Sequence, residues 1–200
     1  MLNYKEIADR DLHNLKGGEQ VVALHETGHL IAMYALGLFD KFEYITIKPG
    51  AGTLGLTELN KDDLNEFGRV FTDKAARSAA SPDNYQAYCK VLFEDGLHCY
   101  LPHILRHFAG GSICRHYGVG GDELCAIDHA NIKALLIPYN LGDRFSELQT
   151  VADGFLKVVF ERYEKAIKLI CFNLLEKKTL YKADVEKLLE NNKDSVFKWF

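Results

Sequence analysis

Residues 21–32 read VVALHETGHLIA, and this stretch decides how the rest of the chain is interpreted. It lies within a longer apolar run, residues 19–36, that has helical spacing and is closed by Gly37. Because apolar residues lie nearly all round this predicted helix, we expect the rest of the domain to enclose it. Polar side chains on an enclosed helix are costly, so His25, Glu26 and His29 call for a chemical reason.

The pattern His25-Glu26-Thr27-Gly28-His29 is an HExxH motif. Its two histidines are four residues apart, so they project from one helix face and suit one metal ion. Zinc accepts imidazole nitrogens at about 2.0 to 2.1 Å. Glu26 lies roughly 100° round the helix from His25, where it can act as the general base on a zinc-activated water and return the proton to a leaving amine. The motif therefore predicts a zinc-dependent hydrolase.

A catalytic zinc site usually has three protein ligands, so one more must come from elsewhere in the chain. Residues 121–136 read GDELCAIDHANIKALL and join a glycine-containing loop to a predicted helix. Four side chains of this stretch are candidates, and the residues alone do not choose among them. They are Asp122, Glu123, Asp128 and His129.

His103 and His107 form a second pair of histidines four residues apart. Ile104 stands where a general base would have to be, and the surrounding segment has its own apolar stripe. We therefore interpret this pair as structural or surface histidines.

The remaining pattern predicts an α+β fold that is predominantly helical. Residues 42–48 (FEYITIK) and 53–59 (TLGLTEL) form the only good β signal and predict a strand, a turn and a second strand. Helical periodicity predicts four further helices after the hairpin and a peripheral segment. They cover residues 97–118, 128–137 and 146–178, with a shorter one beginning near Lys182.

Composition sets the outer limits on function. The 200 residues are 48% hydrophobic and 26% charged, a globular balance that suits one domain. A net charge of -4 gives no reason to bind nucleic acid or an anionic membrane. No apolar window approaches eighteen residues and the N-terminus is charged, so we expect a cytoplasmic protein. The five cysteines are scattered without a CxxC pair, so we expect reduced, mostly buried thiols.

The chain also resembles the peptidase domain of the FtsH-type ATP-dependent zinc metalloproteases. Four places carry the resemblance, in the same order as in that family, and span most of residues 19–189. They are VVALHETGHLIA, YITIKPGAGTLGLTEL, HILRHFAGGSICRHYG followed by AIDHANIKALL, and LLEKKTLYKADVEKLL.

This resemblance implies a single zincin-like peptidase domain. It matches Asp128 to the family's zinc-binding aspartate, so that His25, His29 and Asp128 would hold zinc and Glu26 would be the base. It also implies that an extended polypeptide substrate adds a strand along residues 43–48, and that the chain could assemble as a homo-oligomer. The implied divisions are a lead-in (1–18), the zinc helix and cleft strands (19–57), a peripheral segment (58–96), the third-ligand region (97–140) and the C-terminal helices (146–192).

Several departures from the family pattern bear on function. Thr27 replaces an alanine, and residues 112–116 (SICRH) stand where the family has Arg-Ala-Ala-Glu-Glu. We find no GxxxxGK[ST] phosphate loop and no spanning segment. We therefore expect a metallopeptidase that cleaves unfolded or short polypeptides, or one that borrows a separate ATPase as its unfoldase. Two alternatives stay open: a non-catalytic binding module on the same fold, and hydrolysis of a non-peptide bond.

Overall fold

The structure is a computed structural model, and it describes residues 1–50, 53–59, 101–136 and 142–190. The described chain is predominantly helical with one small antiparallel sheet, which confirms the predicted α+β class. Its α-helices are α1 (Tyr4–Ile7), α2 (Gly18–Ala35), α6 (Leu101–Tyr117), α7 (Cys125–Leu136), α8 (Phe145–Arg162), α9 (Glu164–Lys177) and α10 (Lys182–Glu190). Its strands are β1 (Phe42–Thr46), β2 (Leu56–Leu59) and β3 (Thr179–Tyr181). Short 3-10 turns are Leu12–Asn14, Phe39–Lys41, Asp122–Leu124 and Gly142–Arg144.

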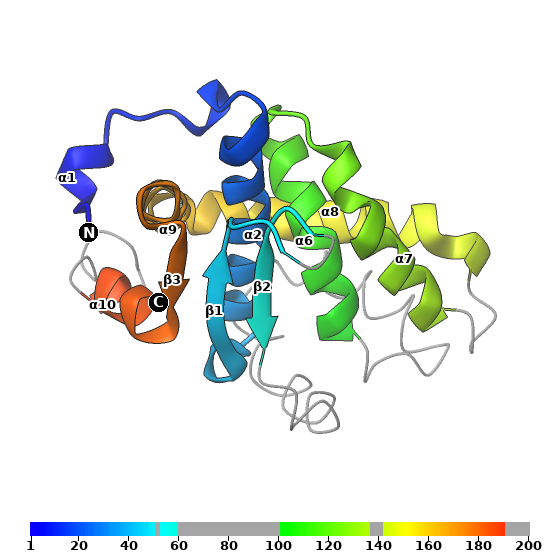
Figure 1. The fold of residues 1–200 in the computed structure, drawn as a ribbon. Coiled ribbons are helices and arrows are strands. Elements are labelled where there is room, and N and C mark those ends of the chain that lie inside the picture. Colours follow the sequence, from blue (N-terminus) through cyan, green and yellow to red (C-terminus); the bar gives the residue numbers. More distant parts are fainter. Residues whose placement is uncertain (51–52, 60–100, 137–141, 191–200) are drawn as a thin grey trace.

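Helix α2 is the centre of the fold (Figure 1). The sheet lies against one side of it, α6 and α7 lie on another, and α8 runs behind. Every residue from Val21 to Met33 is buried, as its apolar composition predicted. The helix begins after Gly17, whose φ of 59° lies in the left-handed region that glycine adopts without strain. The HExxH motif is thus held inside the most enclosed element of the chain.

Helix α6 crosses α2 at very short range because glycines lie at the contact. A Cβ on Gly28 would come within 2.7 Å of the carbonyl oxygen of Ala109. On the other side of the crossing, Gly110 faces α2, whereas a Cβ on Gly111 would meet the sulfur of Cys125 in α7 at 2.6 Å. The close helix crossing expected at the paired glycines is therefore present, and it brings α2, α6 and α7 together.

The sheet has the order β2-β1-β3, with both pairings antiparallel. Ile45 of β1, Thr57 of β2 and Leu180 of β3 lie side by side and are buried on the α2 side. Because β1 has a partner on each side, the expectation that a substrate strand adds along residues 43–48 is wrong. The short strand β3, which the sequence analysis did not predict, occupies that edge.

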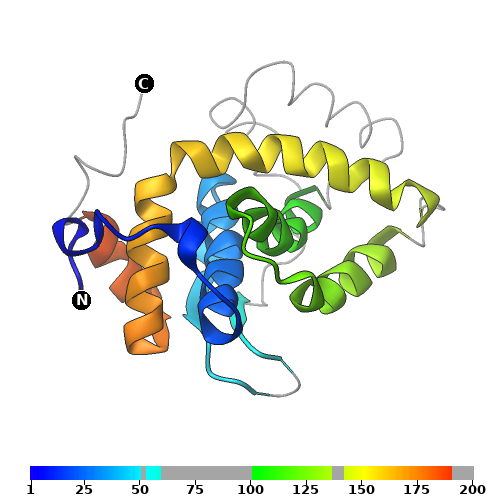
Figure 2. The same ribbon diagram turned by 90° about the horizontal axis from the view of Figure 1, so that it is seen from above.

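The predicted single helix over residues 146–178 is also wrong, because the chain turns sharply at Tyr163. Figure 2 shows α8 (yellow) and α9 (orange) running in clearly different directions, with a sharp bend between them. Tyr163 is buried, and its ring lies edge-on to Tyr34 of α2 with centroids 5.9 Å apart. The two halves pack on different partners, α8 on α6 and α9 on α2. Tertiary packing therefore bends a stretch whose local pattern continues through the break.

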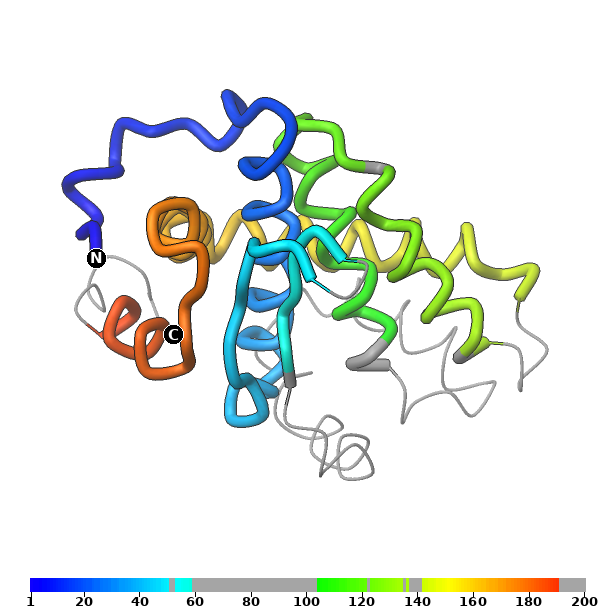
Figure 3. The backbone as a smooth tube through the Cα atoms, in the orientation of Figure 1, coloured from blue at the N-terminus to red at the C-terminus, as the bar shows by residue number. Residues whose placement is uncertain are grey.

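The ends of the described chain lie close to α9. Figure 3 traces the lead-in from α1 across to the start of α2. Buried Asn173 of α9 accepts a hydrogen bond from the backbone N–H of Leu2 and donates one to its carbonyl oxygen, at 2.7 and 3.1 Å. Helix α10 begins at Lys182, as predicted. None of the helices in the described ranges is both long and apolar enough to cross a membrane.

Some predictions fall outside the described residues. They include nearly all of the peripheral segment 58–96 and the end of the helix expected to reach Ile137. Of the five cysteines, Cys114, Cys125 and Cys171 are described, and all three are buried and reduced, as expected.

Candidate metal centre

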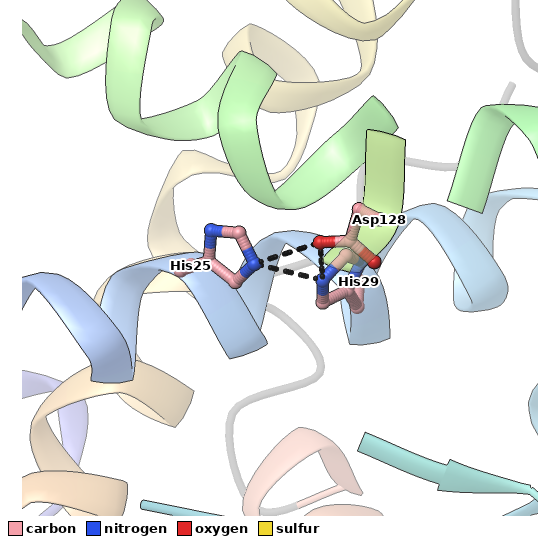
Figure 4. Close-up of side chains that lie close together, drawn as sticks. All are labelled: His25, His29 and Asp128. Carbon is pink, nitrogen blue, oxygen red and sulfur yellow. Dashed lines mark hydrogen bonds and ion pairs between the residues drawn. The ribbon is translucent and has the colours of Figure 1, made fainter. Parts of the chain in front are cut away.

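His25 and His29 project from one face of α2 toward α6 and α7 (Figure 4). Their Nε2 atoms lie 3.1 Å apart, and the rings meet edge to face at 4.7 Å between centroids. Both residues are buried, at 3% and 7% exposure. Two buried imidazoles whose nitrogens face each other need either a proton or a metal ion between those nitrogens.

Asp128 completes the cluster from the first turn of α7. Its Oδ2 lies 3.1 Å from Nε2 of His25 and 3.3 Å from Nε2 of His29. The N-terminal end of a helix stabilises a carboxylate through the helix dipole, which favours an ionised Asp128 here. The structure thus brings His25, His29 and Asp128 together as a group that could hold a metal ion.

The spacing of these three atoms fits a small cation. In a tetrahedral site with bonds of about 2.0 to 2.1 Å, the ligand atoms lie about 3.3 to 3.4 Å from one another. The three separations observed are 3.1, 3.1 and 3.3 Å. Two imidazole nitrogens and one carboxylate oxygen are also a donor set that zinc accepts with a fourth position left open.

A backbone contact fixes the orientation of His29. Its Nδ1 donates to the carbonyl oxygen of Arg106 in α6 at 2.6 Å, so the Nε2 lone pair faces the cluster. His25 Nδ1, in contrast, is buried and has no hydrogen-bond partner among the described residues. In the metal-free protein its tautomer is therefore set at Nε2, which donates to Oδ2 of the ionised Asp128 at 3.1 Å.

Gly110 of α6 makes room for the two imidazoles. A Cβ at this position would lie 2.5 Å from Nε2 of His25 and 2.7 Å from Nε2 of His29. Any side chain here would therefore occupy the space where the ligand atoms converge. Gly110 therefore not only permits the close helix crossing but also leaves space next to the metal-binding nitrogens.

The charges of the cluster are strongly coupled. Burial lowers the pKa of His29, but the charge of Asp128 and its hydrogen bond outweigh burial, and the pKa rises to about 8. Burial raises the pKa of Asp128, but His29 and the hydrogen bonds from His107 and His25 outweigh it, so the net pKa is well below the usual range. Asp128 is therefore ionised at neutral pH, and a proton takes the cation's place in the metal-free protein.

Glu26 lies beside the cluster, on the side of α2 that faces the sheet. Thr57 of β2 donates to Oε2 of Glu26 at 2.8 Å, and its hydroxyl is 3.1 Å from the Glu26 carbonyl oxygen. A Cβ on Gly55 would lie 2.9 Å from Oε1, so only glycine leaves room for this carboxylate. The β-hairpin thus fixes the position of the Glu26 carboxylate, which belongs to the residue that follows His25 in the sequence. Neither contact was anticipated from the sequence.

Two of the other candidates for a third ligand, Glu123 and His129, lie outside the cluster. Glu123 is exposed in the 3-10 turn before α7. His129 packs its ring against Phe108 and Phe145, with centroids 6.5 and 5.0 Å apart. The side chains of Asp122 and His103 are not among those described. Among the three candidates whose side chains are described, the geometry therefore selects Asp128.

His107 lies at the cluster, although its sequence context suggested only a structural or surface role. Its Nδ1 is 2.9 Å from Oδ1 of Asp128. The sequence places His107 one helical turn before Gly110. That spacing indicates a position at the cluster only once the crossing of α6 and α2 is known.

The stretch 112–116, which departs from the family pattern, serves the packing of α6 on α8. Ser112 donates a hydrogen bond to Asp153 of α8, and Arg115 forms an ion pair with the same carboxylate at 2.8 Å. These side chains tie the two helices together rather than contact the His-His-Asp group.

Compared with known proteins, the chain matches no protein-family model, and no curated protein sequence matches it.

Proposed function

We propose that this chain is a zinc metallopeptidase, with His25, His29 and Asp128 as metal ligands and Glu26 as general base. The observation that carries the proposal is the convergence of His25, His29 and Asp128, whose ligand atoms all lie within 4.8 Å of one another. Glu26, held by the Thr57 hydroxyl, follows His25 directly in the sequence. The resemblance of VVALHETGHLIA and AIDHANIKALL to the peptidase domain of the FtsH-type proteases supports the same assignment.

When bound in such a site, zinc lowers the pKa of a water to about 7 and polarises a carbonyl group. The chain's own residues supply the rest of the chemistry. Glu26 accepts a proton from the attacking water and delivers it to the leaving amine. Thr57 holds one oxygen of Glu26, which leaves the other free for that proton transfer. Asp128 offsets part of the cation's charge.

The substrate we propose is an unfolded or short polypeptide. Among the described residues, β2 has a strand on one side only, and its Thr57 contacts the base. An extended peptide could therefore pair with the outer edge of β2 and lie next to Glu26. Methylating alternate backbone nitrogens of a cleaved peptide should then slow its hydrolysis; equal rates with and without methylation would remove this binding mode.

A separate ATPase that unfolds substrates, and assembly into a homo-oligomer, are further proposals that rest on the family resemblance. Neither is needed for cleavage of a substrate that is already unfolded. A cytoplasmic location is a further proposal, and the buried, reduced thiols of Cys114, Cys125 and Cys171 support it.

The experiment is cleavage profiling with casein and an unbiased peptide mixture. Zinc-loaded wild type should generate new peptide termini, and Glu26→Gln, which keeps the ligand set, should generate none while holding the same amount of zinc. If both proteins bind zinc and are equally inert on every peptide, the peptidase proposal fails and a binding module on this fold takes its place. Hydrolysis of ester or other acyl substrates alone would point to a non-peptide bond.

A further inference from the structure

His107 of α6 contacts the one oxygen of Asp128 that faces away from the two histidines of α2. Its Nδ1 lies 2.9 Å from Oδ1, whereas Oδ2 is the atom close to His25 and His29. The His107 side chain is 14% exposed, so water does not compete freely for this contact. His107 is not part of the group whose ligand atoms converge, so any effect on a metal passes through Asp128.

The neighbouring arginine decides which ring nitrogen of His107 carries the proton. Nη2 of Arg106 lies 3.3 Å from Nε2 of His107. A guanidinium is always a donor, so Nε2 must accept. In a neutral ring the proton then resides on Nδ1, which donates to Oδ1 of Asp128. Arg106, His107 and Asp128 thus form a directed chain of hydrogen bonds.

This chain has a consequence for the shape of the metal site. With Oδ1 occupied by the His107 N–H, the carboxylate cannot rotate freely, and Oδ2 stays directed at the two imidazoles. A carboxylate without that contact could rotate or turn toward solvent, because α7 presents Asp128 in its first turn next to a glycine-containing loop. Holding a ligand in its binding orientation raises metal affinity, since less freedom is lost on binding.

We propose that His107 is a positioning residue that holds the Asp128 carboxylate for the metal through its Nδ1–H, with Arg106 fixing the tautomer. The inference rests on the metal site of the proposed function. Removing an outer hydrogen bond to a metal ligand typically costs about 10- to 100-fold in affinity, and we expect a loss in that range.

Two substitutions of nearly equal shape separate hydrogen bonding from packing. In His107→Asn, the amide nitrogen takes the place of Nδ1 and can still donate to Oδ1 of Asp128. In His107→Leu, a methyl group stands there instead. Zinc affinity of the metal-free proteins is measured by competition with a chromophoric chelator, and the unfolding midpoint of each metal-free variant shows that it is folded.

The expected result is an affinity within a few-fold of wild type for His107→Asn and about 10- to 100-fold weaker for His107→Leu. Wild-type affinity in His107→Leu, or the same loss in both variants, would overturn the role of the N–H. A wild type that binds zinc but cleaves nothing would defeat the proposed peptidase while leaving this inference intact. A wild type that binds no zinc would overturn both.

A second measurement reads the tautomer directly. Long-range proton–nitrogen correlation spectra of the zinc-loaded protein, assigned with His107→Asn, should show His107 protonated at Nδ1 and not at Nε2. The opposite pattern would contradict the proposed chain from Arg106 to Asp128, even if the affinities agreed.

Discussion

Nε2 of His25 lies 3.1 Å from Oδ2 of Asp128, a residue 103 positions further along the chain. The first atom belongs to the central helix α2 and the second to α7, which packs mainly on the intervening helix α6. A cation bound between them would therefore tie together two elements whose described contacts run mainly through a third. Metal binding and stability of the fold must then be linked.

Zinc should stabilise the folded protein. A ligand present at 100 times its Kd adds about 2.7 kcal/mol to the free energy of unfolding when only the folded state binds it. We expect a higher unfolding temperature with zinc and a lower one after chelation, measured by circular dichroism. Glu26→Gln should keep the full shift because it retains every ligand. The same unfolding temperature with zinc, without zinc and with chelator would argue against a metal between α2 and α7.

Gly110→Ala should abolish metal binding. The added Cβ would come 2.5 Å from Nε2 of His25 and 2.7 Å from Nε2 of His29, so the imidazoles must move apart. Gly154→Ala in α8 is the control, because a Cβ there meets nothing within 4 Å. We expect that control to bind zinc normally and to gain about 0.5 to 1 kcal/mol of stability. Undiminished zinc affinity in Gly110→Ala would show that the ligand atoms converge elsewhere.

Zinc binding should release a proton at neutral pH. The pKa of His29 is raised to about 8 in the metal-free cluster, so the ring is largely protonated at pH 7 and must lose its proton to become a ligand. The apparent affinity should fall about tenfold per unit of pH below 8 and level off above it. Calorimetry in buffers with different ionisation enthalpies measures the proton count. Binding at pH 7 without proton release would contradict the raised pKa.

Thr57→Val should slow catalysis without removing the metal. The substitution keeps the shape of the side chain but deletes the hydroxyl that donates to Oε2 of Glu26 at 2.8 Å. We expect turnover to fall about tenfold, which corresponds to about 1.4 kcal/mol, with zinc content unchanged. Thr53→Val is the matched control, since the Thr53 hydroxyl donates to the Gly50 carbonyl oxygen in the same hairpin and, among the described residues, to no group of the site. Equal turnover in Thr57→Val and wild type would remove Thr57 from the positioning of the base.

Local pattern was enough to predict the elements that carry the motif. Helix α2 starts and ends within one residue of the predicted range 19–36, because its apolar periodicity and the glycines at its ends act locally. The β-hairpin was also predicted, since its β-branched and aromatic residues surround a turn. The spacing of His25 and His29 fixed their common face before any tertiary contact was known.

Long-range packing decided what the pattern left open. Residue types in the stretch 121–136 gave four candidates for a third ligand, and the family resemblance pointed to Asp128. The approach of α7 to α2 across α6 brings that carboxylate to the two histidines. Strand β3 has three residues and exists because β1 offers an edge. The turn at Tyr163 depends on α8 and α9 having different partners. The contact of His107 with Asp128 likewise depends on the packing of α6 and α7, which local sequence does not reveal.

The central claim is that one cation lies between His25, His29 and Asp128, and zinc content per chain tests it most directly. Protein purified without chelators and analysed by elemental mass spectrometry should contain about one zinc per chain, and Asp128→Ala should contain clearly less under the same conditions. Wild-type protein that cannot be loaded with zinc, or Asp128→Ala that retains a full equivalent, would contradict the account.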